Sequence, residues 1–328
     1  MKDLLIIGAG PIGLACAISA QRAGLTATVF DKGALVNSMV GYPTDLEFFS
    51  TPELLEIGGH PFTTRNYKPF RAEALEYYRQ VAAAEKLDLK LYEPVQEVNG
   101  EQGNFELVTP KGRYTGRNVV VATGFFDVPI RLNVPGEDLP HVTHYYKEPY
   151  PYVGQRVVVI GAKNSAAKAA LDCYRHGAHV TMLVRSSEIS PKVKYWVKPD
   201  LENRIKEGSI QALFDTHVQE ITPEAVHVQT PNGPAQIEAD WILAMTGYQP
   251  DFSFLTSLGV ELDDDPFMTP VHDPETMETN RAGLYLAGVV CGGKKTSVWF
   301  IENSRVHADQ IAAHVASRSV ELEPAVVS

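Results

Sequence analysis

The sequence predicts an α/β protein of two domains, each built around a parallel sheet, with the second domain inserted in the first. Two glycine-rich turns, beginning at Gly8 and Gly161, each follow a short aliphatic run. Farther along, each half has an apolar strand that ends in Thr-Gly, at residues 123–124 and 246–247. A last strand near residues 283–288 has no partner strands of its own, so we expect it to complete the first sheet. A chain of 328 residues is also near the size at which one core divides into two.

The first glycine-rich turn has the spacing of a dinucleotide-binding fingerprint. It reads Gly8-Ala-Gly10-Pro11-Ile-Gly13 after an aliphatic strand, and a helix is predicted to begin near Pro11. Asp31 ends the second strand-like run. The glycines allow a tight turn and a close approach to a pyrophosphate, the helix N-terminus offers free N–H groups, and the acid can accept hydrogen bonds from ribose hydroxyls. The first domain is therefore predicted to bind a dinucleotide.

The second glycine-rich turn predicts a different coenzyme. Gly161 opens it, Lys163 replaces the middle glycine and adds a cation near the phosphates, and Asn164 and Ser165 can cap the helix that follows. Arg185 occupies the position that matches the ribose acid of the first half. Because a guanidinium pairs with a 2′-phosphate that a carboxylate would repel, this half favours NADPH over NADH. Arg185 can also be an ordinary exposed arginine.

Residues 36–71 account for much of the extra length of the first half. The segment is rich in aromatic residues and prolines, which is unlike a disordered linker. Because it directly follows the ribose acid, we expect it to run along the first nucleotide toward its reactive end. The alternative is a long loop packed for stability.

Composition excludes several partners and sites. The net charge of −11, from 29 basic and 40 acidic residues, argues against nucleic acid and anionic membranes. No apolar run reaches the ~18 residues of a membrane span, and no signal peptide is apparent, so we expect a cytoplasmic protein. Cys16, Cys173 and Cys291 lie far apart, which predicts neither a disulfide framework nor a metal site.

The duplicated architecture resembles that of the low-molecular-weight thioredoxin reductase family over essentially the whole chain. The resemblance implies two Rossmann-like, three-layer domains: residues 1–124 and 247–328 would bind FAD, and the inserted residues 125–246 would bind NADPH. Several longer motifs are similar to those of its bacillithiol disulfide reductase subgroup: Tyr42-Pro-Thr, residues 48–58, Tyr77-Tyr-Arg79, residues 161–166, Lys194-Tyr-Trp-Val197 and Phe300-Ile-Glu-Asn303.

The subgroup resemblance implies an enzyme that uses FAD and NADPH to reduce a small disulfide carrying glucosamine and malate groups. We also expect a homo-oligomer. The expected FAD contacts are Gly8, Gly10, Pro11, Gly13, Asp31, Lys32, Tyr42, Val95, Thr123, Gly124 and Gly288. The expected NADPH contacts are Gly161, Lys163, Asn164, Ser165, Arg185 and Gly247.

The sequence departs from these relatives in its cysteines. It lacks the Cys-x-x-Cys pair of thioredoxin reductases, so we do not expect it to reduce thioredoxin. Ile12 stands where the subgroup often has a cysteine, and Cys16 and Cys173 are expected to pack in the core. Cys291 is the remaining candidate for an attacking thiol, because it precedes the final helix, whose N-terminus would lower its pKa.

Two other functions remain open. A reductase that passes electrons one at a time between NADPH and ferredoxin or flavodoxin needs no cysteine. A non-catalytic flavoprotein that senses the redox state of NADPH is the third possibility, and fold alone does not separate the three.

Overall fold

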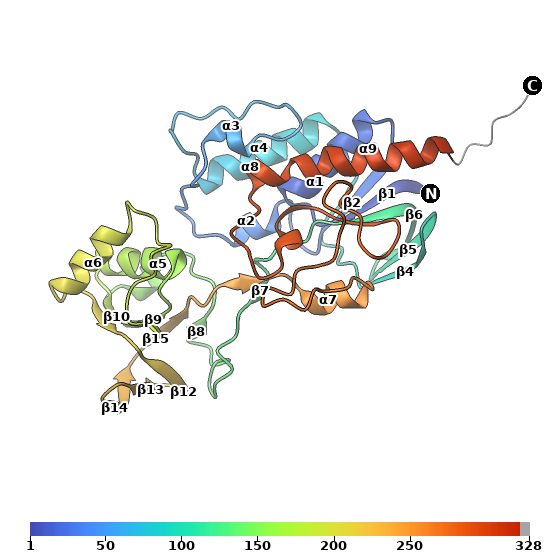
Figure 1. Cartoon of the computed structure of the whole chain (residues 1–328). Helices are drawn as coiled ribbons and strands as arrows, with labels where there is room; N and C mark the ends of the chain where they lie inside the picture. The colour runs from blue at the N-terminus through green and yellow to red at the C-terminus, as the bar shows by residue number, and fades with distance from the viewer. Residues whose placement is uncertain (322–328) are drawn as a thin grey trace, which may run out of the picture. The chain divides into compact units, whose positions relative to one another are not determined.

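The computed structural model describes residues 1–321 and divides into two compact units (Figure 1). Unit 1 comprises Met1–Gly41, Leu46–Val128 and the chain from Tyr248 onward, and unit 2 comprises Tyr42–Asp45 and Pro129–Gly247. Unit 2 therefore interrupts unit 1 in the sequence. At the two main crossings the short strands β7 (Val128–Pro129) and β16 (Tyr248–Gln249) pair with each other.

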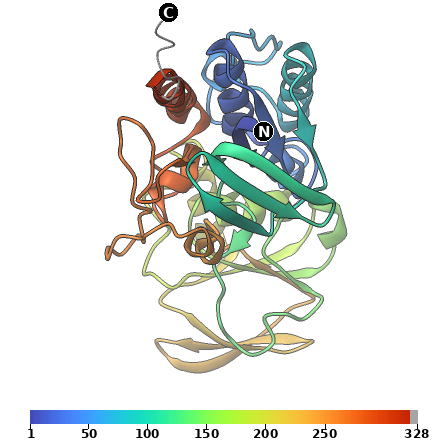
Figure 2. The ribbon, with the colours of Figure 1, turned by 90° about the vertical axis from the view of Figure 1, so that its right-hand side faces the viewer.

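Unit 1 is built on a seven-stranded sheet in the order β3-β2-β1-β6-β5-β4, with β17 also paired to β6. The long strand β6 joins two kinds of pairing, since it runs parallel to β1 and β17 and antiparallel to β5. In the view of Figure 2 the antiparallel strands β4 and β5 lie toward the viewer. The strands are β1 (Lys2–Ile7), β2 (Ala27–Phe30), β3 (Leu89–Lys90), β4 (Glu97–Glu101), β5 (Asn104–Thr109), β6 (Gly112–Val121) and β17 (Leu284–Leu286).

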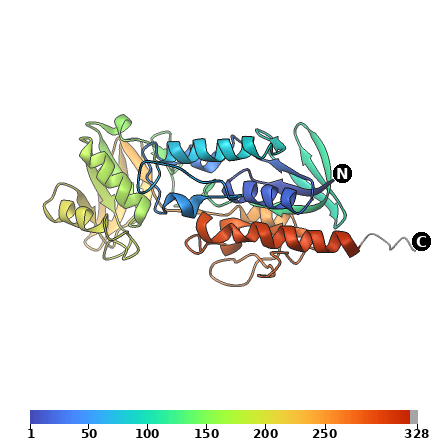
Figure 3. The same ribbon diagram turned by 90° about the horizontal axis from the view of Figure 1, so that it is seen from above.

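Three helices, α4, α1 and α9, lie side by side over one face of this sheet (Figure 3). The side chains of Leu14 and Ile18 in α1 are fully buried. The helical segments of unit 1 are α1 (Pro11–Arg22), α2 (Asn37–Gly41), α3 (Pro52–Leu55), α4 (Arg71–Ala84), α7 (Phe252–Ser257), the 3₁₀ turn η2 (Gly288–Gly292), α8 (Ile301–Ser304) and α9 (Val306–Glu321).

The end of the chain returns to unit 1, as predicted. Strand β17 pairs with β6 in parallel, with Leu284 opposite Val119. The predicted final helix is divided at Arg305 into α8 and α9. The Arg305 guanidinium donates hydrogen bonds to the carbonyls of Glu53 (3.1 Å) and Glu56 (2.9 Å), which fixes α8 against the end of α3.

Much of the 36–71 segment is packed for stability. The buried Phe62 ring stacks on Tyr77 of α4, with ring centroids 4.3 Å apart. The Tyr77 hydroxyl accepts a hydrogen bond from the Ile57 amide (2.9 Å) and donates one to the His60 carbonyl (2.8 Å). These contacts support the structural interpretation of the segment, while its expected course along a nucleotide remains a prediction.

Unit 2 contains a five-stranded parallel sheet in the order β11-β10-β9-β15-β8 and a three-stranded antiparallel sheet, β12-β13-β14. Its elements are β8 (Val142–Thr143), the 3₁₀ turn η1 (Tyr150–Tyr152), β9 (Arg156–Ile160), α5 (Asn164–Arg175), β10 (His179–Leu183), α6 (Lys198–Lys206), β11 (Gln211–Leu213), β12 (His217–Ile221), β13 (Ala225–Thr230), β14 (Gly233–Glu238) and β15 (Trp241–Ala244).

The side chains of β9 point alternately to the two faces of the parallel sheet, and each face is covered by a different layer of unit 2. Val157 and Val159 pack in the cluster that contains the buried face of α5. Val158 and Ile160 point the other way, into the cluster formed with the three-stranded sheet. Because both faces of β9 are covered, its sequence is continuously aliphatic, as expected of a central parallel strand. No helix within residues 1–321 is both long and apolar enough to cross a membrane.

Candidate nucleotide-binding and redox site

The first glycine-rich turn is shaped by two close backbone approaches and one open position. Gly8 has a φ of +113°, and a Cβ there would collide with the Ala122 carbonyl; a Cβ on Gly13 would collide with the carbonyl of Gly8. Gly10 is different, because a Cβ built on it meets nothing within 4 Å. Gly8 and Gly13 are thus required by the fold, whereas Gly10 leaves space where a ligand can approach the backbone.

That space lies at the N-terminus of α1. Gly10 is the N-cap residue, no side chain caps the helix, and Pro11 occupies its first turn. The first-turn amides of Ile12 and Gly13 have no partner one turn earlier within the helix. Together with the helix dipole they form a site suited to a pyrophosphate.

Asp31 is held in a fixed orientation beside this turn. Its two carboxylate oxygens accept hydrogen bonds from the amides of Ala9 and Gly33, both at 2.8 Å. Burial raises the pKa of Asp31 above its usual value, against the effect of these two hydrogen bonds, and the nearby Asp127 raises it further. The remaining lone pairs of the carboxylate can accept hydrogen bonds from ribose hydroxyls.

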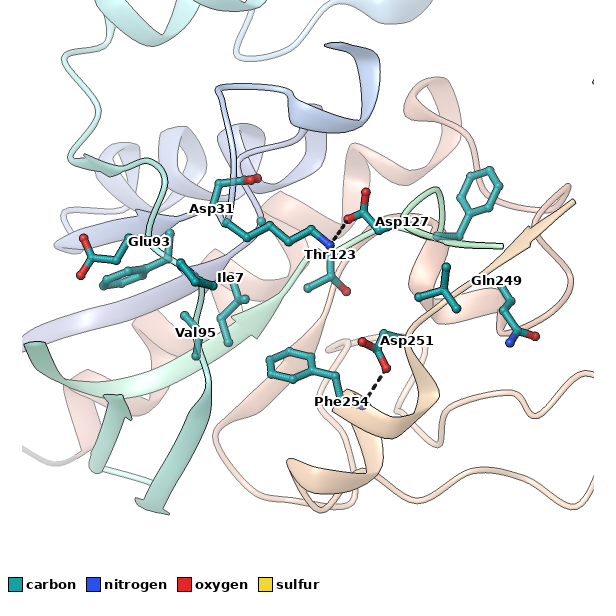
Figure 4. A pocket seen from close by; sticks show the side chains of 16 residues that line it. Ile7, Asp31, Glu93, Val95, Thr123, Asp127, Gln249, Asp251 and Phe254 are labelled. Atoms are coloured by element: carbon teal, nitrogen blue, oxygen red, sulfur yellow. Dashed lines mark hydrogen bonds and ion pairs between the residues drawn. The ribbon is translucent and has the colours of Figure 1, made fainter. Parts of the chain in front are cut away.

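A pocket of about 150 Å³ opens at the carboxyl ends of β1, β2 and β6 (Figure 4). The structure brings six of the predicted FAD contacts into its lining: Gly8, Asp31, Lys32, Val95, Thr123 and Gly124. The other lining residues are Ile7, Phe30, Glu93, Pro94, Phe125, Asp127, Val128, Gln249, Asp251 and Phe254. All of them belong to unit 1.

Three predicted FAD contacts shape the cradle without lining the pocket, namely Gly10, Pro11 and Gly13. Gly288 lies at the end of β17, where its amide donates a hydrogen bond to His307 Nδ1 (3.1 Å). Tyr42 is not among the residues that line the pocket, and residues 42–45 group with unit 2.

The pocket carries acids that the sequence analysis missed. Glu93 accepts hydrogen bonds from the Thr109 and Tyr114 hydroxyls, both at 2.7 Å. Burial acts to raise the pKa of Glu93, but these hydrogen bonds oppose it, and the net result is a pKa below the usual value. Asp251 accepts from the amide of Phe254 (3.0 Å) and caps α7. Glu93 follows β3 at the same sheet edge as Asp31, and the rule that ligands bind at the carboxyl ends of parallel strands is the signal that could have found it.

Lys32 forms an ion pair with Asp127 at 2.9 Å. Asp127 is labelled in Figure 4. Asp31, Glu93 and Asp251 are further acids in the lining. Such a lining suits hydroxyl groups, which can donate to carboxylates, better than phosphates, for which the α1 N-terminus is the suitable position.

The second glycine-rich turn repeats the backbone geometry of the first. Gly161 has a φ of +136°, and a Cβ on it would lie 2.6 Å from the Met245 carbonyl oxygen. The helix α5 follows with Lys163 as its N-cap, and no side chain caps it. The prediction that Asn164 or Ser165 caps this helix is therefore wrong. The Asn164 side chain instead donates to the Lys192 carbonyl and accepts from the Lys194 amide.

The other predicted NADPH contacts lie around this turn in unit 2. Arg185 follows the carboxyl end of β10, is exposed, and makes no ion pair with any residue that the structure describes. Gly247 has a φ of +99°, and its carbonyl accepts from the Ile130 amide (2.9 Å). The Thr246 hydroxyl donates to the Ile130 carbonyl (2.6 Å), which fixes the Thr-Gly turn at the end of β15.

All three thiols are buried. Burial raises the pKa of Cys16 and of Cys173 to about 12, and it raises the pKa of Cys291 as well. The expectation of a lowered pKa at Cys291 is wrong, because this residue lies within η2 and the next helix begins only at Ile301. Its Sγ lies 3.9 Å from His307 Nδ1.

Comparisons with known proteins agree with this geometry. Residues 5–288 match the family model described as pyridine nucleotide-disulphide oxidoreductase. The chain belongs to this family. It is an oxidoreductase that uses a pyridine nucleotide. It is 44% identical over 319 residues to bacilliredoxin reductase Bdr of Bacillus subtilis (strain 168), covering 97% of this chain and 98% of the relative.

Solved structures show the same relationship. Bacillithiol disulfide reductase Bdr from Bacillus cereus superposes with a TM-score of 0.94 at 43% identity, over 97% of this chain and 99% of that one. The resemblance to the bacillithiol disulfide reductase subgroup is thereby confirmed. A thioredoxin reductase from T. acidophilum shares the fold at 22% identity, with a TM-score of 0.77 over 97% of this chain and 99% of that chain, which confirms the predicted fold class.

Proposed function

We propose that this protein is an FAD-dependent oxidoreductase that uses NADPH to reduce a low-molecular-weight disulfide, bacillithiol disulfide. The observation that carries the proposal is similarity over nearly the whole length to proteins named bacilliredoxin reductase and bacillithiol disulfide reductase. The two glycine-rich turns, one in each unit, supply the two nucleotide sites that such a reaction needs.

We assign FAD to residues 1–124 and 247–328. The α1 N-terminus and the open position at Gly10 would receive the pyrophosphate, and Asp31 would bind ribose hydroxyls. When bound, FAD supplies two-electron transfer, and the protein contributes position and electrostatics. Asp31 is already oriented by two amides, so it needs little reorganisation to bind the diol.

We assign NADPH to the predicted inserted domain, residues 125–246, of which residues 125–128 group with unit 1 in the structure. The α5 N-terminus lacks a side-chain cap, and Lys163 and Arg185 place positive charge on the same unit. The exposed guanidinium of Arg185 can bind a 2′-phosphate bidentately, which NADH does not offer.

Reduction of a disulfide to two thiols consumes two electrons and two protons. In a thiol-dependent route a protein thiolate attacks one sulfur and forms a mixed disulfide. All three thiols are buried, and burial raises the pKa of each, which disfavours the thiolate that such an attack needs. We therefore propose that electrons pass to the substrate without a protein cysteine.

The test is NADPH oxidation by the flavin-loaded protein with bacillithiol disulfide, glutathione disulfide, ferredoxin, flavodoxin and oxygen as separate acceptors. Turnover with bacillithiol disulfide well above that with every other acceptor is expected. Turnover only with ferredoxin or flavodoxin would replace the proposal with the second candidate, a ferredoxin-NADP or flavodoxin-NADP reductase. The buried thiols favour that candidate too, because single-electron transfer needs none.

A third outcome would also contradict the proposal. Reduction of the flavin by NADPH with no turnover on any acceptor would indicate a sensor of the NADPH redox state. Gly10→Val, which fills the open position in the first turn, is the matched negative control for flavin-dependent turnover.

A further inference from the structure

Two adjacent aromatic side chains of unit 2 are exposed on a loop that is hydrogen-bonded to the second glycine-rich turn. Tyr195 is 82% exposed and Trp196 is 43% exposed, and their rings meet edge to face with centroids 4.8 Å apart. Their neighbours Val193 and Val197 are buried in the core of unit 2. The loop is thus anchored on both sides of the pair, and both side chains keep a large solvent-exposed fraction.

The loop is also bonded directly to the nucleotide turn. The Asn164 side chain donates to the Lys192 carbonyl (3.1 Å) and accepts from the Lys194 amide (3.0 Å). The Ser190 amide donates to the Ala162 carbonyl (3.1 Å). Because Ala162 and Asn164 belong to the turn and to the first turn of α5, the position of the loop relative to a bound nucleotide is fixed by three hydrogen bonds.

The order of residues identifies which half of a nucleotide the loop faces. Arg185 occupies the position after the second strand, which in dinucleotide-binding folds addresses the adenosine ribose. The loop that carries Tyr195 and Trp196 begins directly after Arg185. It also carries Lys192 and Lys194, and Lys194 Nζ lies 5.8 Å from the centroid of the Trp196 ring. Aromatic surface next to positive charge is suited to a purine that carries a nearby phosphate.

We propose that Tyr195 and Trp196 form the platform on which the adenine ring of NADPH stacks. This inference rests on the proposed function only in its assignment of NADPH to unit 2. Stacking needs no hydrogen-bond partner on the base, so the pair contributes affinity, while selection of the 2′-phosphate remains with Arg185. The bonds from Asn164 hold the platform in place before the coenzyme arrives, which limits the ordering cost of binding.

The test measures the affinity of the flavin-loaded protein for 2′,5′-ADP, the adenine half of the coenzyme, by titration calorimetry. Replacing Tyr195 and Trp196 together by Leu is expected to weaken binding about 10-fold or more, whereas Trp196→Phe retains most of the affinity. Tyr150→Leu is the matched control, because Tyr150 is a 67% exposed aromatic of the same unit on a different segment. Flavin content and near-ultraviolet circular dichroism verify that each variant is folded.

An unchanged 2′,5′-ADP affinity in the double Leu variant would overturn the proposal. If that variant binds 2′,5′-ADP normally but has a raised KM for the disulfide, the aromatic pair contacts the substrate and the proposal is wrong. Failure of the proposed function shows elsewhere: a parent protein that oxidises NADH but does not bind 2′,5′-ADP refutes the coenzyme assignment. The acceptor panel on the parent tests the disulfide independently of either aromatic residue.

Discussion

His307 is expected to make the stability of unit 1 depend on pH. Its side chain is 1% exposed, lies against the Trp299 ring and accepts a hydrogen bond from the Gly288 amide (3.1 Å). Burial, with a smaller effect of His272, lowers the pKa of His307 to about 4 from an ordinary value of 6.5. Protonation at Nδ1 would also remove the acceptor of the Gly288 bond, so acid is expected to loosen the end of β17.

The direction of the change in the free energy of unfolding depends on whether the folded or the unfolded chain binds the proton more strongly. Between pH 6.5 and pH 4 the unfolded chain protonates His307 and the folded chain does not, so the free energy of unfolding falls as the pH falls through this window. At ~1.4 kcal/mol per pH unit, the loss attributable to His307 is about 2 kcal/mol at pH 5 and approaches about 3 kcal/mol near pH 4. Above pH 7 the contribution is close to zero.

Urea unfolding of the parent and of His307→Gln at pH 7.5 and pH 5.0, followed by circular dichroism, measures this effect. The glutamine variant is expected to be less stable than the parent at pH 7.5 and to lose about 2 kcal/mol less than the parent on acidification. His179→Gln, at an exposed position, controls for losing a histidine as such. Equal acid sensitivity in the parent and in His307→Gln would refute the reasoning.

Three further predictions concern the cofactors and the thiols. Arg185→Ala is expected to weaken NADPH binding by about 1 to 3 kcal/mol and to leave NADH almost unchanged, so an equal loss for both in a fluorescence titration contradicts the assignment. Gly10→Val is expected to abolish FAD binding, and stoichiometric flavin in the purified variant would show that the first turn does not hold the cofactor. Joint replacement of Cys16, Cys173 and Cys291 by Ala or Ser is expected to leave flavin reduction intact and disulfide turnover within a small factor of the parent; loss of turnover in Cys291→Ser alone would identify that thiol as the nucleophile.

The sequence was most informative where function requires a local backbone shape. Gly8 and Gly161 both have a positive φ, and a Cβ on either would collide with a nearby backbone carbonyl. Only glycine meets both requirements, so these positions can be recognised in the sequence. The return of β17 to unit 1 could likewise be predicted, because an isolated strand must find a sheet. In both cases the structure is determined by the backbone, through a turn that requires glycine or a strand that requires hydrogen-bond partners. Local sequence patterns indicate both of these well.

The residues that were missed depend on distant parts of the chain. Asp127 and Asp251 reach the pocket from segments far from the first turn, and no spacing rule links them to Asp31. The same applies to Asn164, whose side chain bonds residues near position 192 instead of capping its own helix. The pKa of Cys291 also escaped prediction, because burial is a tertiary property that the neighbouring glycines and lysines do not reveal.

The position of Ile12 bears on how electrons reach the substrate. Ile12 lies in the first turn of α1, and a Cβ on Gly288 would lie 3.3 Å from Ile12 Cγ1, so this side chain fills the space between the first turn and the end of β17. A cysteine at position 12 would have both a helix N-terminus to lower its pKa and a place beside β17, whereas Cys16 and Cys291 are buried and have raised pKa values. The chain thus has an aliphatic residue at the position best suited to a reactive thiol. We infer that this protein reduces its substrate by direct transfer of electrons to the bound disulfide. Specificity would then depend on the groups that bind the disulfide.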